Sequence, residues 1–172
     1  MTITDFRPLA NEWTIADLEE LPAGVRAEVH NGTLVVMSPA RLWHQHVEWE
    51  LCKALKAAGR PAFTQVGVLR TPRDTRVADV GVFHEPPSDL DATWHEPAAL
   101  ALVAEVWSPS SDAKDRNPSW YAERGIREYW FAEPVDGDDH DALIVMYELA
   151  TTLTGRTEYV ERRRVTLKEL AG

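Results

Sequence analysis

Residues 100–107, which read Leu-Ala-Leu-Val-Ala-Glu-Val-Trp, decide the fold because they form an almost continuously apolar run interrupted by one carboxylate. A run of this length is typical of a strand that is covered on both faces. Residues 63–69 and 77–83 also have the pattern of extended segments. We therefore expect these three segments to form the centre of a β-sheet.

Helical and turn patterns lie around these strands. From Trp43 to Ala58, apolar residues recur at spacings of three and four, which predicts a helix that ends before Gly59 and Pro61. Asn31-Gly32 predicts a hairpin turn between strands at 26–30 and 33–38, because these two residues tolerate positive φ values. The other predicted elements are helices at 14–21 and 118–124, a proline-rich loop at 84–97, a strand at 127–131, an acidic turn at 135–141, closing strands at 142–149 and 157–160, and a strand or helical turn at 165–170. This order predicts a mixed α/β fold of the α+β kind, with an N-terminal hairpin and a central mixed sheet flanked by helices.

The composition fits a single domain over residues 1–172. The chain is 44% hydrophobic, which disfavours disordered and collagen-like proteins. The single cysteine, Cys52, cannot form an internal disulfide, and there is no secretory leader or apolar run of about 18 residues. We therefore expect a cytoplasmic protein without membrane association. The net charge of −10 argues against a broadly basic nucleic-acid-binding surface, so contact with a polyanion would need a local basic patch or a metal ion.

Three carboxylates interrupt the apolar strands. Asp79 lies within 77–83, Glu105 lies within 100–107, and Glu28 lies in the first strand of the hairpin. A carboxylate removed from water costs several kcal/mol unless a cation pairs with it. Either each one pairs with an arginine at a sheet edge, or all three converge on a divalent cation such as Mg²⁺ or Mn²⁺, which prefers hard oxygen ligands.

An ordered set of short motifs runs through most of the chain. These motifs are Trp13-Thr14-Ile15 with Asp17-Leu18, Glu28 with Asn31-Gly32, Ser38-Pro39 followed by His44, Val77-Ala78-Asp79-Val80, Glu105-Val106-Trp107-Ser108-Pro109-Ser110, and Tyr121-Ala122 through Gly125-Ile126 to Glu128-Tyr129-Trp130. Together they resemble the Uma-type putative restriction endonuclease family of bacteria, within the PD-(D/E)XK nuclease superfamily. The resemblance weakens after about Leu149.

The resemblance implies a restriction-endonuclease-like core and metal-dependent hydrolysis of phosphodiester bonds, normally in DNA. Asp79 and Glu105 match the two acidic metal ligands, and Glu28 matches the acid on the early strand, which would orient the metal through a water. A backbone carbonyl near Val106 would supply a further ligand. The implied ion is Mg²⁺ or Mn²⁺, which would polarise the phosphate and acidify the attacking water.

Two positions depart from the superfamily pattern. Ala78 stands where the superfamily has proline, and Trp107 stands where its simplest pattern has the catalytic lysine. Close relatives supply a lysine from the following helix, for which Lys114 is the nearest substitute here and Arg116 the second. Arginine stays charged and can only stabilise negative charge, whereas a lysine can lose its proton. The alternative function is therefore a catalytically inactive nuclease-like domain that binds nucleic acid or a protein partner.

The remaining candidates concern nucleic-acid contact and a second type of metal site. Arg70, Arg73 and Arg76 precede Asp79 and form a candidate phosphate-contacting patch, with a solvated loop as the alternative. His44 is either a residue of the active-site cleft or a structural histidine. His44, His46 and Glu50 reproduce the spacing of a cupin-type metal site, but that site needs a strand and this segment has helical periodicity. Two-strand cleavage would also be easily achieved by a homodimer.

Overall fold

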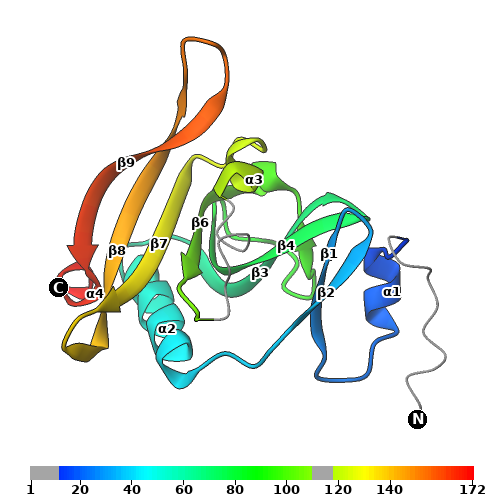
Figure 1. Ribbon diagram of the computed structural model, residues 1–172, viewed down its shortest axis with the longest axis horizontal. Coiled ribbons are helices and arrows are strands. Elements are labelled where there is room, and N and C mark those ends of the chain that lie inside the picture. Colours follow the sequence, from blue (N-terminus) through cyan, green and yellow to red (C-terminus); the bar gives the residue numbers. More distant parts are fainter. Residues whose placement is uncertain (1–11, 110–117) are drawn as a thin grey trace.

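The computed structural model describes residues 12–109 and 118–172, and its strands there form a seven-stranded mixed sheet (Figure 1). The strand order is β5-β3-β4-β6-β7-β8-β9, in which only the β3/β5 and β6/β7 pairs are parallel. The strands are β3 (Ala62–Thr71), β4 (Asp74–Phe83), β5 (Trp94–His95), β6 (Leu100–Val106), β7 (Glu128–Val135), β8 (Asp138–Thr151) and β9 (Thr157–Thr166). The predicted central mixed sheet flanked by helices is confirmed.

The predicted N-terminal hairpin is also present. Strands β1 (Arg26–His30) and β2 (Thr33–Met37) form a separate antiparallel pair. Asn31 and Gly32 between them have φ values of 50° and 84°, as a primed two-residue turn requires. The backbone N–H of Val29 donates to the Thr75 hydroxyl at 3.0 Å. This contact joins the hairpin to β4 and brings Glu28 towards the sheet.

Helices cover both faces of the sheet. Helix α2 (Leu42–Ala57) and helix α4 (Leu167–Ala171) pack on one face, in a core that contains Leu51 and Leu102. Helix α3 (Pro118–Ala122) packs on the other face, in a core that contains Val103. Successive residues of β6 therefore alternate between the two cores. By this alternation Glu105 shares the face of Val103, beneath α3.

Several predicted boundaries are wrong. The 84–97 loop contains β5, which pairs with the outer side of β3, so β3 lies second from the edge instead of at the centre. Most of the predicted acidic turn at 135–141 is strand, because Asp138 already belongs to β8. Strand β9 extends to Thr166, where the charged residues 161–164 pair along β8. Local polarity suggested a turn at 135–141 and an end of the strand at 160, whereas the ladder of backbone hydrogen bonds continues the strand in both places.

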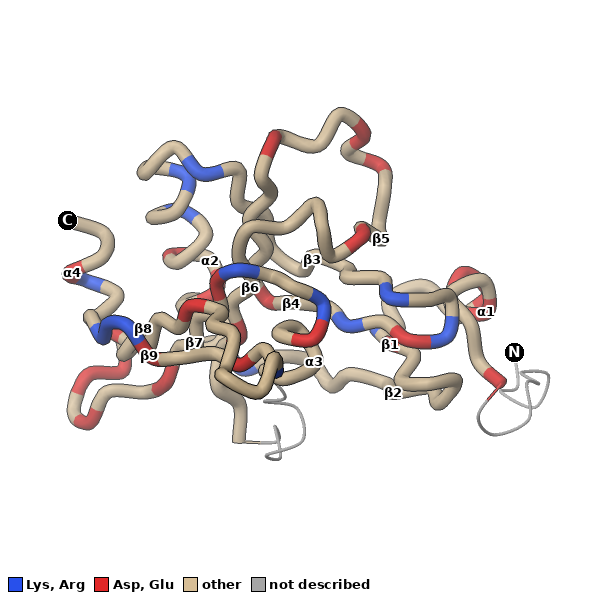
Figure 2. The backbone as a smooth tube through the Cα atoms, turned by 90° about the horizontal axis from the view of Figure 1, so that it is seen from above, with Lys and Arg blue, Asp and Glu red and all other residues tan. Residues whose placement is uncertain are grey.

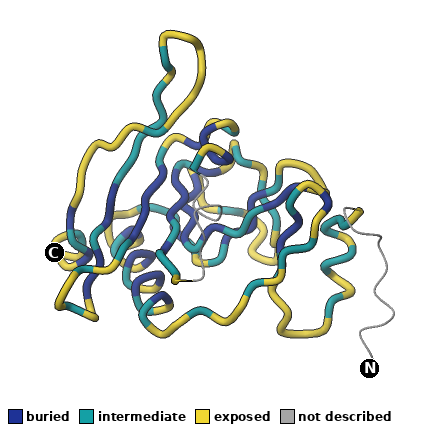
Figure 3. Tube along the Cα trace, in the orientation of Figure 1, coloured by how far each residue is buried: buried dark blue, intermediate teal, exposed yellow. Residues whose placement is uncertain are grey.

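The long β8–β9 hairpin projects beyond the rest of the sheet, and its tip is exposed (Figures 1 and 3). The buried positions concentrate instead on β4, β6 and β7 and on the inner side of α2 (Figure 3). The short helix α1 (Ile15–Glu19) begins with a capping box formed by Thr14 and Asp17. No helix among the described residues is long and apolar enough to cross a membrane.

Candidate active site

A cavity of about 310 Å³ lies between the hairpin, the N-terminal part of α2 and the middle of the sheet. Glu28 from β1, Asp79 from β4 and Glu105 from β6 all line this cavity. The structure thus brings together the three carboxylates that interrupt the apolar strands. His44, from the start of α2, lines the same cavity.

Asp79 is held by hydrogen bonds from three elements. The backbone N–H of Val106 donates to its Oδ2 at 2.8 Å, and the His44 Nε2 lies 3.1 Å from the same oxygen. The Gln65 side-chain amide donates to Oδ1 at 3.4 Å. Within residues 12–109 and 118–172, no lysine or arginine forms an ion pair with Asp79. The arginine pairing that was the alternative explanation for this carboxylate is therefore not seen in the described structure.

His44, Glu48 and Asp79 form a compact set of potential metal ligands, with one donor atom from each lying within 4.8 Å of the others. His44 and Glu48 are one helical turn apart and share a face of α2, with the His44 Nδ1 3.7 Å from a Glu48 oxygen. This Nδ1 is buried, and no described residue forms a hydrogen bond with it. A buried donor or acceptor without a partner is costly, so this atom is suited to a ligand.

The protonation of this set follows from its geometry. Burial lowers the pKa of His44, but the hydrogen bond to Asp79 and the charges of Asp79 and Glu48 outweigh burial and raise it above its ordinary value. Burial also raises the pKa of Glu48, and the charge of Asp79 raises it further. His44 therefore supplies at most one positive charge to the two neighbouring carboxylates, Asp79 and Glu48.

Gln65 connects the two carboxylates of this set from β3. Its side-chain amide also donates to Glu48 at 2.8 Å. Gln65 has a φ of 55°, which is rare for a residue other than glycine and costs about 1–3 kcal/mol. Backbone strain of this kind persists where the surroundings fix the residue and is frequent at functional sites. Neither Gln65 nor Glu48 was predicted from the sequence as a site residue.

Glu105 lies on the other side of Asp79 and accepts a hydrogen bond from the Tyr121 hydroxyl at 2.6 Å. Burial and the charge of Asp79 raise the pKa of Glu105 well above its ordinary value. The buried Tyr121 belongs to α3, so α3 fixes the position of this carboxylate. A buried carboxylate whose pKa is raised by a second carboxylate beside it is an arrangement that a divalent cation stabilises.

Glu28 is engaged by its own neighbours. The backbone N–H of Val77 donates to its Oε1 at 2.7 Å, and its Oε2 contacts the His30 ring. Glu28 is buried at the base of the hairpin. With both oxygens occupied, it faces the cavity as a hydrogen-bonded carboxylate, a geometry that suits contact with a metal through water.

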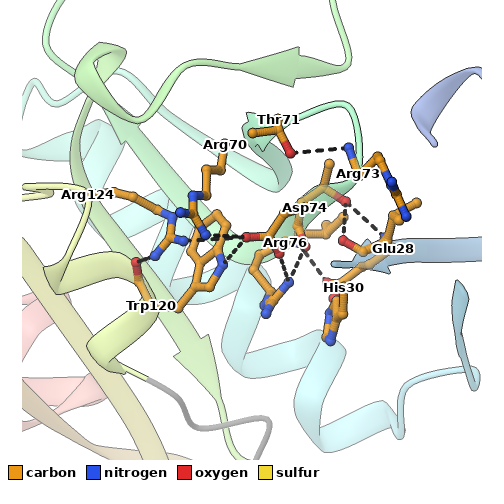
Figure 4. Close-up of polar contacts among 12 residues, drawn as sticks. Glu28, His30, Arg70, Thr71, Arg73, Asp74, Arg76, Trp120 and Arg124 are labelled. Carbon is orange, nitrogen blue, oxygen red and sulfur yellow. Dashed lines mark hydrogen bonds and ion pairs between the residues drawn. The ribbon is translucent and has the colours of Figure 1, made fainter. Parts of the chain in front are cut away.

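Part of the predicted phosphate patch is engaged in a different interaction. Arg70 and Arg76 form ion pairs with Asp74 at 3.3 Å and 3.1 Å, and Arg124 joins them at 3.4 Å (Figure 4). The Trp120 indole N–H donates to the same carboxylate at 3.1 Å. Asp74 is only 2% exposed. We name this group, Arg70, Asp74, Arg76, Trp120 and Arg124, the Asp74 cluster.

The remaining members of the candidate set differ in what the structure describes. Arg73 lies in the turn between β3 and β4, where its backbone N–H donates to Thr71. Lys114 and Arg116 lie outside the described residues. Trp107 packs edge-to-face against Trp43, with ring centroids 6.4 Å apart.

The cupin-like spacing does not produce a shared site. Residues 44–50 are helical, so His44 and His46 point in different directions. His46 approaches His140 instead, and Glu50 pairs with Lys53.

A mixed sheet flanked by helices, in which acids from two strands of the sheet and from the adjoining hairpin meet at one cavity, is typical of the restriction-endonuclease-like class of folds. The profile of the Uma2 family, described as "Putative restriction endonuclease", matches residues 15–164. The chain therefore belongs to the Uma2 family. It is also similar in fold to the crystal structure of a putative nuclease belonging to DUF820 from Anabaena variabilis ATCC 29413. That structure is 15% identical, the match covers 92% of this chain and 97% of the other, and the TM-score is 0.63. No curated protein matches the chain.

Proposed function

We propose that the chain is a metal-dependent endonuclease that hydrolyses phosphodiester bonds in DNA. The observation that carries this proposal is the convergence of Glu28, Asp79 and Glu105 on one cavity. No lysine or arginine of the described chain forms an ion pair with any of the three. Facing carboxylates without a cation are unfavourable, so the cavity is suited to bind one.

The donor atoms fit a divalent ion. Asp79 and Glu105 would hold Mg²⁺ or Mn²⁺ through carboxylate oxygens, with Glu28 acting through water. The unpartnered Nδ1 of His44 and the nearby Glu48 offer a further imidazole and carboxylate, a mixture that favours Mn²⁺ over Mg²⁺. Once bound, the ion would polarise a phosphate oxygen and lower the pKa of the attacking water.

The chain's own residues orient these groups. The Val106 N–H fixes Asp79, and Tyr121 fixes Glu105, so both carboxylates are positioned before substrate arrives. His44 holds a proton more firmly than an ordinary histidine, because Asp79 and Glu48 lie beside it. Only the neutral imidazole can bind a metal, so an ion held by Nδ1 would displace this proton on binding. The proposal places this chemistry in the cytoplasm.

The test compares two charge-neutral variants with a matched control. Asp79→Asn and Glu105→Gln keep the shape of each side chain, and Asp91→Asn makes the same change in an exposed loop. We expect Asp91→Asn to bind Mn²⁺ and nick plasmid DNA like the wild type. Both site variants should lose calorimetric Mn²⁺ binding and nicking together. Undiminished Mn²⁺-dependent nicking in both site variants would contradict the proposal.

A second candidate function is a catalytically inactive domain that binds nucleic acid. It is favoured by Trp107, which stands at the lysine position and packs on Trp43 instead of reaching for a phosphate. Lys114 then decides between the two functions. A Lys114→Ala variant that binds Mn²⁺ but no longer nicks DNA supports the enzyme, whereas a wild type that binds oligonucleotides and never cleaves them supports the inactive domain.

A further inference from the structure

Two grooves adjoin the carboxylate cavity on opposite sides of α2, and each contains tryptophan. Successive helical residues point about 100° apart, so His44 and Glu48 share one face. Trp43 lies about 100° to one side of His44, and Trp49 lies about 100° beyond Glu48 on the other side. The residues that face the cavity are thus flanked by an indole on each side.

The first tryptophan groove is lined by Trp43 and Trp107 and has a volume of about 560 Å³. It shares His44 and Ser108 with the carboxylate cavity, so the two spaces adjoin. The two indoles are half-buried and meet edge-to-face, which leaves apolar surface towards the groove. An apolar, aromatic lining next to charged carboxylates suits a flat ring better than a phosphate.

The second tryptophan groove is lined by Trp49, Val25 and Val36 and has a volume of about 650 Å³. It shares Arg26 and Gln65 with the carboxylate cavity. Trp49 is 64% exposed, and Val36 is 60% exposed. Large apolar side chains exposed together beside a site mark a binding surface.

One arginine at each groove is available for a phosphate. Arg26 lines the second groove and Arg41 lines the first, and both are exposed. Neither forms an ion pair with any residue in the described part of the chain. Arg70 and Arg76, by contrast, are engaged by Asp74. Lysine and arginine positions are otherwise interspersed with acidic ones along the chain (Figure 2).

We propose that the substrate is a single-stranded nucleic acid that crosses the N-terminal part of α2, with one phosphate at the carboxylate cavity and unpaired bases in the two tryptophan grooves. This inference rests on the proposed nuclease function and specifies its substrate class. Stacking on aromatic side chains is available only to bases that are free of a duplex, and Arg26 and Arg41 supply positive charge for the backbone beside the two grooves. A duplex clamp would need a continuous basic surface, which the chain's net charge of −10 disfavours.

The test measures binding by fluorescence anisotropy in Ca²⁺, which occupies carboxylate sites, with gels to confirm that the probes stay intact. The probes are labelled oligothymidylate, oligouridylate and a DNA duplex of matching length. We expect both single strands to bind more tightly than the duplex. Trp49→Ala should weaken single-strand binding by about 5- to 100-fold, the range for losing one stacked base, and Trp49→Phe should restore most of it.

Further variants give this test its controls. Leu90→Ala removes an equally exposed apolar side chain from a loop that lines neither groove, and it should change nothing. Arg41→Ala should weaken binding of both single strands. It should also make the decrease of the log association constant with log salt concentration shallower, by about 0.7 in slope. All these positions are exposed, so the variants should fold.

Two outcomes would overturn the inference. Equal or tighter binding of the duplex, with no effect of Trp49→Ala, would place the bases elsewhere. Loss of a dimer in Trp49→Ala, with unchanged oligonucleotide binding, would make the second groove a contact between copies of the chain. Mn²⁺-dependent nicking would survive in either case, so failure of this inference is distinguishable from failure of the proposed function. If only one of the two single strands binds, the substrate class is narrowed to DNA or to RNA.

Discussion

Strand β4 carries two carboxylates five residues apart, and their surroundings are opposite. Asp74, at the start of β4, is surrounded by three arginines and an indole N–H. Asp79 accepts a backbone N–H and faces His44, Glu48 and Glu105. Burial alone would raise the pKa of Asp74, but the hydrogen bond from Trp120 and the charge of Arg76 lower it below its ordinary value. Across the cavity, the pKa of Glu105 is raised.

The difference separates a carboxylate that is neutralised within the chain from one for which we propose a bound metal ion. The Asp74 cluster neutralises its acid within the chain and therefore stabilises the folded state. The acids of the cavity form no ion pair with a described lysine or arginine, so their charge would be neutralised by a bound cation. Helix α3 connects the two, because Trp120 reaches Asp74 and the next residue, Tyr121, reaches Glu105.

The largest expected effect is on the Asp74 cluster. Asp74→Asn leaves three guanidinium groups without their carboxylate, and Arg124 is almost completely buried. Removing one partner from a buried ion pair costs about 3–5 kcal/mol of unfolding free energy. Urea denaturation followed by circular dichroism measures this. Glu148→Gln, which removes surface ion pairs with Arg127 and Arg162, is the control and should leave the urea midpoint nearly unchanged. Equal urea midpoints for the two variants would contradict the difference between the Asp74 cluster and a surface ion pair.

The Asp74 cluster should also determine how the free energy of unfolding changes at acidic pH. The folded-state pKa of Asp74 lies below its ordinary value of 3.8, so its contribution to stability is fully present above that value. The contribution is lost as the pH falls through the lowered folded pKa. Stability of the wild type should therefore fall more steeply below about pH 4 than that of Asp74→Asn. Urea denaturation of both proteins across this pH range measures the difference. If the unfolding free energies of the wild type and Asp74→Asn fall in parallel, Asp74 is not stabilised as a carboxylate ion.

A smaller effect is expected where α3 supports the cavity. Tyr121→Phe removes only the hydroxyl that donates to Glu105. Losing a partner of this kind typically weakens metal binding by about 10- to 100-fold. Calorimetric titration with Mn²⁺ measures the change, and Tyr159→Phe, which loses a hydroxyl bonded to the Ile126 carbonyl, is the matched control. If both variants bind Mn²⁺ equally, Tyr121 has no role in positioning Glu105.

The site residues that could be predicted from the sequence are the charged ones that interrupt apolar strands. Glu28, Asp79 and Glu105 stood out because a carboxylate in an apolar strand is costly, and the structure places all three at one cavity. Glu48 carried a weaker signal. It lies four residues after His44, but charged residues on helices usually face solvent.

Other features depend on contacts distant in sequence. The backbone of Gln65 has a positive φ. This could not be predicted, because positive φ values are usually adopted by glycine or asparagine and not by glutamine. Asp74 lies among Arg70, Arg73 and Arg76, and the sequence suggested a patch free to bind phosphate. The structure shows that Asp74 points inward and holds two of these arginines. The length of β9 likewise follows from its pairing with β8 and not from its own charged sequence.

The smallest expected effect has the opposite sign to that at Asp74. Glu105→Gln keeps an acceptor for Tyr121 but removes a charge that Asp79 repels, so it should stabilise the metal-free protein by about 1 kcal/mol while weakening Mn²⁺ binding. Because the folded-state pKa of Glu105 is raised above its ordinary value of 4.5, the folded wild type binds a proton more strongly than the unfolded chain. Wild-type stability therefore falls as the pH rises from that value through the folded pKa. Urea denaturation in EDTA should show the gain at about pH 7 and its loss near pH 4, where the carboxyl is protonated in both states. A gain of the same size at both pH values would mean that packing, and not charge, distinguishes the variant.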